Sequence, residues 1–395
     1  METVRTDVLV VGAGPAGSMT AKWAAKHGAK VLMIEKRQEI GSPVRCGEGM
    51  SKDWLEEVGI RPGKWINVEV EGARIYSPSE KCLEINEKHA GNEVGYVVER
   101  DGFDKALAID AANAGVDVWL KTAATAILKE NGTVVGVKAK RFGEPLEIRA
   151  TVTIGADGFE SQVGRWAGLP TNLQLRDMDT CLQYRMTNVE SDVRYCDFYL
   201  GTCAPGGYVW IFPKDEGLAN VGIGVQVSKV QSPADAKSYL DRWIDKHPGY
   251  AKGKKIDMVG GGVSISPPIK QSVTDGFLLV GDAARMIDPL TGGGIANGCI
   301  AGKIAGEVAA KAAIAGAAPR SVLEVYDRAW RLRLEEKLYR NWLAKEKLCS
   351  LSDETFDKVV DALQGVKLEK LTVHNILKAV HTKYPEVTRE FEAFL

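Results

Sequence analysis

The sequence predicts an α/β protein with three parts: a dinucleotide-binding domain, a second domain built on an antiparallel sheet, and a C-terminal helical region. Residues 7–35 have the pattern of a strand, a glycine-rich turn, a helix and a strand. Residues 180–265 show short alternating strands with aromatic residues, which is typical of an antiparallel sheet. Residues 321–395 have a helical composition with mixed charge.

The N-terminal unit begins with an apolar, β-branched run at residues 7–11, and the segment GAGPAG follows directly at residues 12–17. An alanine-rich stretch continues as a helix to His27, where Gly28 ends it. A second apolar strand at residues 31–34 then leads into an acidic residue. This order predicts a βαβ unit.

The residues of this unit suit a dinucleotide. Gly12 permits the tight turn, Gly14 lets the backbone approach a pyrophosphate, and Gly17 allows the helix to pack closely on the strand. The amides that open the helix then face the phosphates. Glu35 ends the second strand, 18 residues after Gly17, and its carboxylate can accept hydrogen bonds from a ribose. We therefore predict a dinucleotide site here.

The rest of the chain supplies further strands and helices. The dipeptide Asn131-Gly132 predicts a hairpin turn between two apolar runs. Strand-like segments lie at residues 69–76, 93–98, 116–120, 152–154 and 277–280, and helical segments at residues 103–114 and 295–314.

Later motifs distinguish between cofactors. The strand at residues 277–280 runs into Gly281-Asp282, and an aspartate at this place in a flavoprotein lies against the ribityl chain and pyrophosphate of FAD. Because NAD has no ribityl chain, Asp282 favours FAD. The segment TGGGI at residues 291–295 opens a helix whose amides can face a flavin ring, although a simply capped helix is the alternative. The segment GADG at residues 155–158, which alone would indicate a turn, completes the pattern.

These three motifs, in this order and spacing, resemble the para-hydroxybenzoate hydroxylase class of FAD enzymes. Two further segments narrow the resemblance: PVRCGEG at residues 43–49, and YVWIFP at residues 208–213 with GIG at residues 222–224. They resemble the geranylgeranyl reductase family, most of all its archaeal digeranylgeranylglycerophospholipid reductases, over the whole length of the chain. The resemblance implies FAD-dependent reduction of isolated C=C bonds in the geranylgeranyl chains of archaeal ether lipids, giving saturated phytanyl chains in membrane lipid biosynthesis.

The resemblance also implies site residues. Arg100 matches an arginine that reaches the phosphate or ribityl region of FAD, although an ion pair with Glu99 or Asp104 is the alternative for its side chain. Ala124 falls where this fold passes its backbone beside the adenine. Together with the residues above, the implied cofactor contacts are Gly12, Gly14, Ala16, Gly17, Glu35, Cys46, Gly47, Gly49, Arg100, Ala124, Asp282, Gly294 and Ile295.

Two segments carry the candidate catalytic and substrate residues. Tyr208, Trp210 and Phe212 alternate, so on a strand they share one face, either as ordinary sheet core or, as the resemblance implies, as the wall of a lipid-chain cavity. Burial of apolar area would hold such a chain. Cys46 has three open roles: a packing residue, a backbone contact to FAD, or a redox thiol or proton donor. Cys46, Tyr208 and ordered water all remain candidates for the proton donor.

The motifs divide the chain into domains. We expect a discontinuous FAD-binding domain of residues 1–65, 95–170 and 270–318. The substrate domain, with the lipid cavity, is expected to comprise residues 66–94 and 171–269, and residues 319–395 form the C-terminal helical region.

Composition excludes several classes of function. The net charge of −1 gives no general attraction for nucleic acid, and seven cysteines without a CxxC pair indicate neither a disulfide framework nor a metal site. No apolar run is long enough to span a bilayer, and the signal-peptide pattern is missing, so we expect a cytosolic location. The basic residues of the C-terminal region form either a solvated helix face or a face for a phosphate head group or the cytoplasmic side of a membrane: Arg328, Arg331, Arg333, Lys337, Arg340, Lys345 and Lys347.

The sequence leaves three alternative functions open. The first is an FAD monooxygenase of the same fold acting on a lipophilic substrate. The second is a quinone reductase of the electron-transfer flavoprotein type, for which the cysteine spacing supplies no iron–sulfur module. The third is a lipid carrier with a structural FAD. The electron donor is left open between a nicotinamide, a ferredoxin and a deazaflavin, as are the lipid head group, the number of bonds reduced and the oligomeric state.

Overall fold

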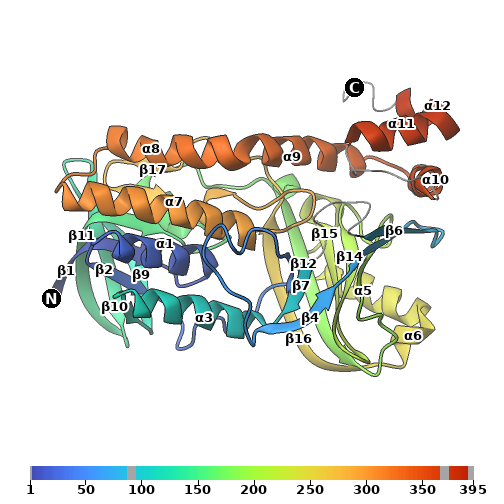
Figure 1. The fold of residues 1–395 in the computed structure, drawn as a ribbon, viewed down its shortest axis with the longest axis horizontal. Helices are drawn as coiled ribbons and strands as arrows, with labels where there is room; N and C mark the ends of the chain where they lie inside the picture. Colours follow the sequence, from blue (N-terminus) through green and yellow to red (C-terminus); the bar gives the residue numbers. More distant parts are fainter. Residues whose placement is uncertain (1, 87–94, 365–372, 390–395) are drawn as a thin grey trace.

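The computed structural model describes residues 2–86, 95–364 and 373–389. Two large sheets lie at opposite ends of the molecule, with a small sheet between them and long helices across the top (Figure 1). The N-terminal sheet holds the predicted βαβ unit, and the second large sheet holds most of the segment predicted as antiparallel.

The N-terminal sheet has eight strands in the order β17-β18-β11-β1-β2-β8, with β10 and β9 added beside β11. The pairs among β18, β11, β1, β2 and β8 are parallel, while β9, β10 and β17 pair antiparallel. The strands are β1 (Glu2–Val11), β2 (Val31–Ile34), β8 (Asp117–Trp119), β9 (Thr122–Glu130), β10 (Thr133–Arg141), β11 (Glu144–Gly155), β17 (Val273–Thr274) and β18 (Phe277–Leu279).

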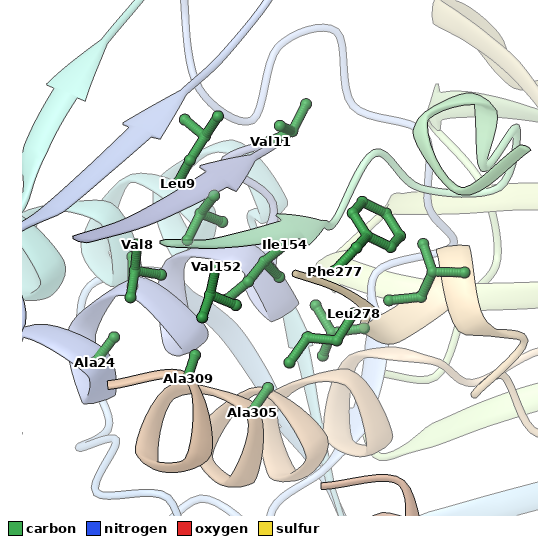
Figure 2. Packing of buried hydrophobic residues seen from close by; sticks show 14 of the residues in the cluster. Val8, Leu9, Val11, Ala24, Val152, Ile154, Phe277, Leu278, Ala305 and Ala309 are labelled. Carbon is green, nitrogen blue, oxygen red and sulfur yellow. The ribbon is translucent and has the colours of Figure 1, made fainter. Parts of the chain in front are cut away.

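Helices α1 (Pro15–Lys26) and α7 (Ile295–Ile314) pack against this sheet and against each other. Figure 2 shows Val8 of β1 and Val152 and Ile154 of β11 beside alanines of both helices. A Cβ atom on Gly302 would lie 2.7 Å from the Ala16 carbonyl oxygen, and one on Gly306 would lie 2.5 Å from the Thr20 carbonyl oxygen. The two helix backbones therefore approach closely because α7 presents glycines to α1.

The second large sheet has seven strands in the order β16-β12-β15-β14-β13-β5-β6, antiparallel except for the β5–β13 pair. Its apolar face carries residues such as Val209, Ile211 and Val221, and α5 (Asp235–Lys246) covers it with Leu240 and Trp243. The strands are β5 (Gly72–Tyr76), β6 (Cys82–Asn86), β12 (Met178–Thr187), β13 (Tyr195–Tyr199), β14 (Tyr208–Asp215), β15 (Leu218–Gln226) and β16 (Lys254–Ser264).

A three-stranded antiparallel sheet lies between the two large ones: β3 (Gly49–Ser51), β7 (Gly95–Val98) and β4 (Ile66–Val70). Both β4 and β7 contact β14 of the second sheet. Helix α3 (Arg100–Asn113) follows β7 directly and packs on α1. The shorter helices are α4 (Gln162–Ala167) and α6 (Pro248–Ala251), with single turns η1 (Leu175–Asp177), η2 (Val227–Lys229) and η3 (Gly281–Ala284).

The C-terminal region is helical, as expected. Helix α8 (Arg320–Trp330), the π-helical turn η4 (Arg331–Glu335) and α9 (Glu336–Leu348) form one long rod that crosses from the N-terminal sheet to the second sheet (Figure 1). The remaining helices, α10 (Asp353–Leu363), α11 (Val373–Lys383) and α12 (Pro385–Arg389), follow beyond β6 at the far end.

Most expected elements are confirmed, with three differences. The strand expected at residues 69–76 is divided into β4 and β5, which belong to different sheets. The antiparallel sheet expected over residues 180–265 also contains α5 and α6, and the expected helix at residues 103–114 begins three residues earlier, at Arg100. The predicted division into domains stays a prediction. Within it, β5 and β6 belong to the second sheet, whereas β4 pairs with β7, and residues 87–94 lie outside the described residues.

Candidate active site

A cleft opens beside the carboxyl ends of β1, β2 and β11, which is where parallel α/β sheets bind ligands. Six of the predicted cofactor residues line it: Gly12, Gly14, Glu35, Arg100, Ala124 and Asp282. The other predicted cofactor residues belong to adjoining elements: Ala16 and Gly17 to α1, Cys46, Gly47 and Gly49 to the segment after the lining residue Arg45, and Gly294 and Ile295 to the start of α7.

The glycines of the first turn have different physical roles. Gly12 has a φ of +110°, and a Cβ atom there would lie 2.3 Å from the Ala156 carbonyl oxygen. A Cβ atom on Gly17 would lie 2.0 Å from the Gly12 carbonyl oxygen, so both glycines are required by the protein's own packing. Gly14 differs, because no atom outside its own neighbouring residues lies within 4 Å of its Cβ position. The space beside Gly14 therefore belongs to the cleft, which fits a backbone that a pyrophosphate approaches.

Glu35 lies at one side of the cleft and is fixed by backbone amides. Its Oε2 accepts a hydrogen bond from the Ala13 amide at 3.1 Å, and its Oε1 accepts one from the Arg37 amide at 3.0 Å. A carboxylate has about four acceptor positions, so two remain for ribose hydroxyls. Ala124, in β9, also lines the cleft. Asp157 of the GADG segment accepts a hydrogen bond from the Val163 amide at 2.9 Å and so caps α4.

Asp282 provides the test of whether the cleft fits FAD. Burial raises the pKa of this carboxyl, and the charges of Arg100 and Arg285 only partly oppose the rise. In the described part of the chain its carboxylate oxygens accept no hydrogen bond, although Asp282 lines the cleft. A Cβ atom on Gly294 would lie 2.7 Å from Asp282 Oδ1, so the TGGGI segment passes directly beside it. Ribityl hydroxyls would supply the donors that this carboxylate lacks.

Arg100 is held inside the site and does not form a surface ion pair. Its Nε and Nη2 donate to the Asp104 carboxylate at 3.0 and 3.1 Å, and both residues line the cleft. Burial alone would lower the pKa of Arg100, but Asp104 and then Cys46 outweigh it and raise the pKa. The ion-pair alternative with Asp104 is therefore present, and the predicted contact of Arg100 with FAD stays a prediction.

The loop that carries Cys46 lies against the aromatic strand β14. A Cβ atom on Gly47 would lie 2.9 Å from the Phe212 ring, and one on Gly49 would lie 3.0 Å from it. The Cys46 carbonyl oxygen accepts a hydrogen bond from Gln183 Nε2 at 3.2 Å. The two segments of the narrow resemblance, more than 150 residues apart in the sequence, are thus neighbours in space.

The three aromatic residues share one face of β14, as predicted. Tyr208 and Trp210 have ring centroids 6.0 Å apart, and Trp210 and Phe212 have centroids 6.3 Å apart. Tyr208 Oη donates a hydrogen bond to the Thr291 carbonyl oxygen at 2.5 Å, which joins β14 to the TGGGI segment. Burial raises the pKa of the Tyr208 hydroxyl. That these rings line a lipid-chain cavity stays a prediction.

The sequence reasoning missed a buried charge cluster behind the Cys46 loop. Glu48 and Lys214 are both 0% exposed in their side chains, and Lys214 Nζ lies 2.9 Å from Glu48 Oε2. Arg185 Nη2 and Asn220 Nδ2 also donate to Oε2, at 2.9 and 2.7 Å. Glu99 accepts from Lys214 at 3.0 Å. The signal was present in the sequence, because Arg185 and Lys214 interrupt apolar strands.

The fold and the cleft define the class of the protein: an FAD-dependent oxidoreductase. A family model described as the geranylgeranyl reductase catalytic domain matches residues 177–263, and one described as pyridine nucleotide-disulphide oxidoreductase matches residues 6–195. The chain belongs to the geranylgeranyl reductase family, among relatives that are named digeranylgeranylglycerophospholipid reductase.

The similarity covers the whole chain. The digeranylgeranylglycerophospholipid reductase of Picrophilus torridus is 53% identical, covering 99% of this chain and 100% of the relative. The enzyme of that name from Thermoplasma acidophilum is 52% identical, with 99% of each chain covered. A crystal structure of a geranylgeranyl bacteriochlorophyll reductase-like protein from Thermoplasma acidophilum has a TM-score of 0.94 and 51% identity, covering 100% of both chains.

More distant structures share only the fold. The FAD-dependent chondrochloren halogenase CndH has a TM-score of 0.72 at 17% identity, covering 96% of this chain and 97% of that protein. The α/β class predicted from the sequence, a glycine-fingerprint FAD-binding domain with an antiparallel sheet domain and C-terminal helices, is confirmed. FAD is the cofactor for which the cleft is built.

Proposed function

We propose that this chain reduces the isolated C=C bonds of geranylgeranyl chains in archaeal ether phospholipids, giving saturated chains. One observation carries the proposal: the Cys46 loop and the aromatic strand, the two segments that carry the resemblance to this family, lie against each other beside the FAD cleft. The full-length relatives that bear the name digeranylgeranylglycerophospholipid reductase support the same conclusion.

The chain's own residues would bind and orient the reactants. When bound, FAD in its reduced form supplies a hydride to one alkene carbon. Gly14 would leave room for the pyrophosphate, while Glu35 and Asp282 would accept hydrogen bonds from hydroxyl groups of the cofactor. An isolated alkene offers no polar handle, so orientation rests on apolar contact with the aromatic face of β14 and on exclusion of water.

Cys46 and Tyr208 receive different roles in this proposal. Cys46 Sγ accepts a hydrogen bond from the Glu48 amide at 3.2 Å, which turns the loop back on itself beside the cleft residue Arg100. We assign Cys46 a contact with the cofactor. The Tyr208 hydroxyl already donates its proton to the Thr291 carbonyl oxygen. Tyr208 therefore forms part of the wall of the site and anchors the TGGGI segment. The electrons come from an external carrier: a nicotinamide, a ferredoxin or a deazaflavin.

We further propose that the long C-terminal rod docks on an anionic membrane surface. Val325, Leu332 and Tyr339 are exposed apolar residues of this rod, one in each of α8, η4 and α9. They are 50%, 93% and 50% exposed. Arg328 and Arg340 are exposed on the same rod. Apolar side chains flanked by basic ones are typical of a helix that lies in the plane of an anionic bilayer.

Only some of the predicted basic residues belong to this face. Arg331 donates to Asp327 and to the Ile269 carbonyl oxygen, and Lys345 is buried beside its partner Glu346. Arg333 is exposed but pairs with Glu57 at 2.8 Å. No helix in the described part of the chain combines the length and hydropathy that a membrane span requires.

Vesicle sedimentation tests the docking proposal. We expect the holoenzyme to bind anionic vesicles more strongly than neutral ones, and Leu332→Asp with Tyr339→Asp to abolish the binding. Ile256→Asp is the matched control, because Ile256 is 62% exposed on β16, far from the rod in sequence. Equal binding by all variants would contradict the proposal.

Expression in a host that makes unsaturated archaeal ether lipids tests the reductase function. Mass spectrometry of the extracted lipids should show two added hydrogen atoms for each double bond reduced. Gly14→Ala is the control, since its Cβ atom would enter the space assigned to the pyrophosphate and has no atom of a non-neighbouring residue within 4 Å. An added oxygen atom would instead indicate the monooxygenase, and unchanged lipids would contradict the proposed activity.

A further inference from the structure

The face of the second sheet that carries the aromatic residues has a gap of about the size of a methyl group over Gly224, which we call the pit. Strand β15 runs between β12 and β14, so Gly224 lies between Cys181 and Tyr208. The atoms nearest to a Cβ placed on Gly224 are Cys181 Sγ at 3.5 Å, Asp179 Oδ2 at 3.7 Å and the Trp210 ring at 3.9 Å. A glycine that has room for a side chain leaves a hollow, and here a thiol, a carboxyl and an aromatic ring form its walls.

The carboxyl in this pit has no partner. Asp179 is 8% exposed, and its Oδ1 atom is buried without a hydrogen bond from any described residue. Its neighbouring cation, Lys345 of α9, pairs with Glu346 instead. Burial raises the pKa of Asp179 to about 7, against the opposing charge of Lys345. Asp179 therefore carries a proton for part of the time at neutral pH.

The other acidic groups at the pit are poor proton sources. The Tyr208 hydroxyl donates to the Thr291 carbonyl oxygen, and burial raises its pKa. Burial also raises the pKa of the Cys181 thiol well above its ordinary value. A group that must lose and regain a proton in each turnover works best with a pKa near the working pH. Of these three groups, the Asp179 carboxyl alone meets that condition.

The pit lies between the two segments that we assign to the flavin. A Cβ atom on Gly292 of the TGGGI segment would lie 3.6 Å from Tyr208 Oη. A Cβ atom on Gly47, next to Cys46, would lie 3.3 Å from Trp210 Nε1. Tyr208 and Trp210 are the β14 residues nearest to the pit, so Asp179 faces the region between the two segments.

We propose that Asp179 is the proton donor of the alkene reduction. One alkene carbon receives a hydride from the reduced flavin, and the other receives the proton of the Asp179 carboxyl. The N–H bond of the reduced flavin that supplies the hydride, the C=C π bond and the O–H bond break, and two C–H bonds form. Oxidised flavin and the Asp179 carboxylate remain, and the carboxylate takes up a proton from water before the next turnover. This inference rests on the reductase function proposed above.

The pH dependence follows from the groups around Asp179. The titratable groups around Asp179 are Cys181 on the same strand, Tyr208 on β14, Lys345 on α9, and Cys349 directly after α9. The wild-type rate should fall as the pH rises through the pKa of Asp179, because the carboxylate has no proton to give.

Single-turnover kinetics tests the proposal. The holoenzymes of wild type, Asp179→Asn and the control Asp177→Asn are reduced with dithionite without oxygen and then mixed with a geranylgeranyl ether lipid. We expect equal flavin reduction in all three proteins. Reoxidation by the lipid should be about 100- to 10,000-fold slower in D179N alone. The infrared difference spectrum between wild type and D179N should show one protonated-carboxyl band that titrates near pH 7.

Each outcome of these measurements either supports or overturns the role of Asp179. A slow D179N without the pH-dependent fall in rate, beside a normal D177N, supports Asp179 as the donor. A D179N that reacts as fast as D177N, or that keeps the wild-type pH profile, overturns the proposal. A difference spectrum between wild type and D179N that lacks this carboxyl band also overturns it. If wild type itself is not reoxidised by the lipid, the reductase function fails, and the proton-donor proposal fails with it.

Discussion

Removal of the buried charge of Glu48 tests how the Cys46 loop is held. Glu48→Gln preserves the size of the side chain but replaces one oxygen by an amide group, which would face the donors of Lys214, Arg185 and Asn220. Loss of one partner from a buried ion pair costs about 3–5 kcal/mol, because the other charge stays buried without compensation.

The structure indicates that the cost of Glu48→Gln lies near the lower end of this range. Lys214 keeps Glu99 at 3.0 Å and the Val98 carbonyl oxygen at 2.7 Å, and Arg185 keeps Glu99 at 3.0 Å. Burial alone would raise the pKa of Glu99, but Lys214 and then Arg185 hold it below its usual value, so Glu99 stays charged. We therefore expect a loss of about 3 kcal/mol in the free energy of unfolding, roughly a hundredfold in the equilibrium constant.

Urea unfolding of the holoenzyme, followed by far-ultraviolet circular dichroism, measures the loss. Glu57→Gln is the control, because Glu57 pairs with Arg333 at the surface, where an ion pair contributes at most about 1 kcal/mol. The double variant with Lys214→Met should recover part of the stability, since it removes the uncompensated cation. A Glu48→Gln protein within about 0.5 kcal/mol of wild type would refute the reasoning.

Three further predictions concern the cleft, the pit and the helix pair. Gly14→Ala should lose bound flavin, as measured by flavin absorbance, while its apoprotein should be as stable to unfolding as the wild-type apoprotein. Gly12→Ala should instead lower the stability of the fold. Equal behaviour of the two variants would contradict their assigned roles. The folded-state pKa of Asp179 lies above its unfolded value of about 3.9, so the native state binds the extra proton and stability should fall between about pH 4 and pH 7. A difference of about three pKa units corresponds to a loss of about 4 kcal/mol in the free energy of unfolding. Thermal unfolding of Asp179→Asn at several pH values should not show this loss. The same dependence of stability on pH in Asp179→Asn and wild type would contradict the prediction. Gly306→Ala should force α1 and α7 apart at a cost of about 1–3 kcal/mol in urea unfolding, and an unaltered midpoint would show that the helices do not touch there.

Much of the fold follows from local signals in the sequence. Asn131 and Gly132 have φ values of +48° and +86°, the left-handed conformations that a two-residue hairpin turn requires. The βαβ unit and α7 end within a residue or so of the predicted limits. Helix α5 was missed because its surroundings are strands, although its buried residues Leu240, Trp243 and Ile244 have helical spacing.

The site could be predicted only in part, because its geometry depends on pairing between distant segments. The glycine fingerprint and Asp282 could be recognised as candidate cofactor residues from the sequence pattern alone. The contact between Gly47 and Phe212, and the position of Asp179 and Trp210 around Gly224, depend on strand register and loop path, which no local pattern encodes. The Glu48 cluster likewise draws its partners from three different strands.

The reaction of the reduced holoenzyme with its lipid, without oxygen, tests the central claim most directly. Purified protein should carry FAD, and addition of a geranylgeranyl ether lipid should reoxidise the reduced flavin in step with the gain of two hydrogen atoms per double bond. A reduced flavin that stays reduced in the presence of the lipid, or a product that contains oxygen when air is admitted, would contradict the account.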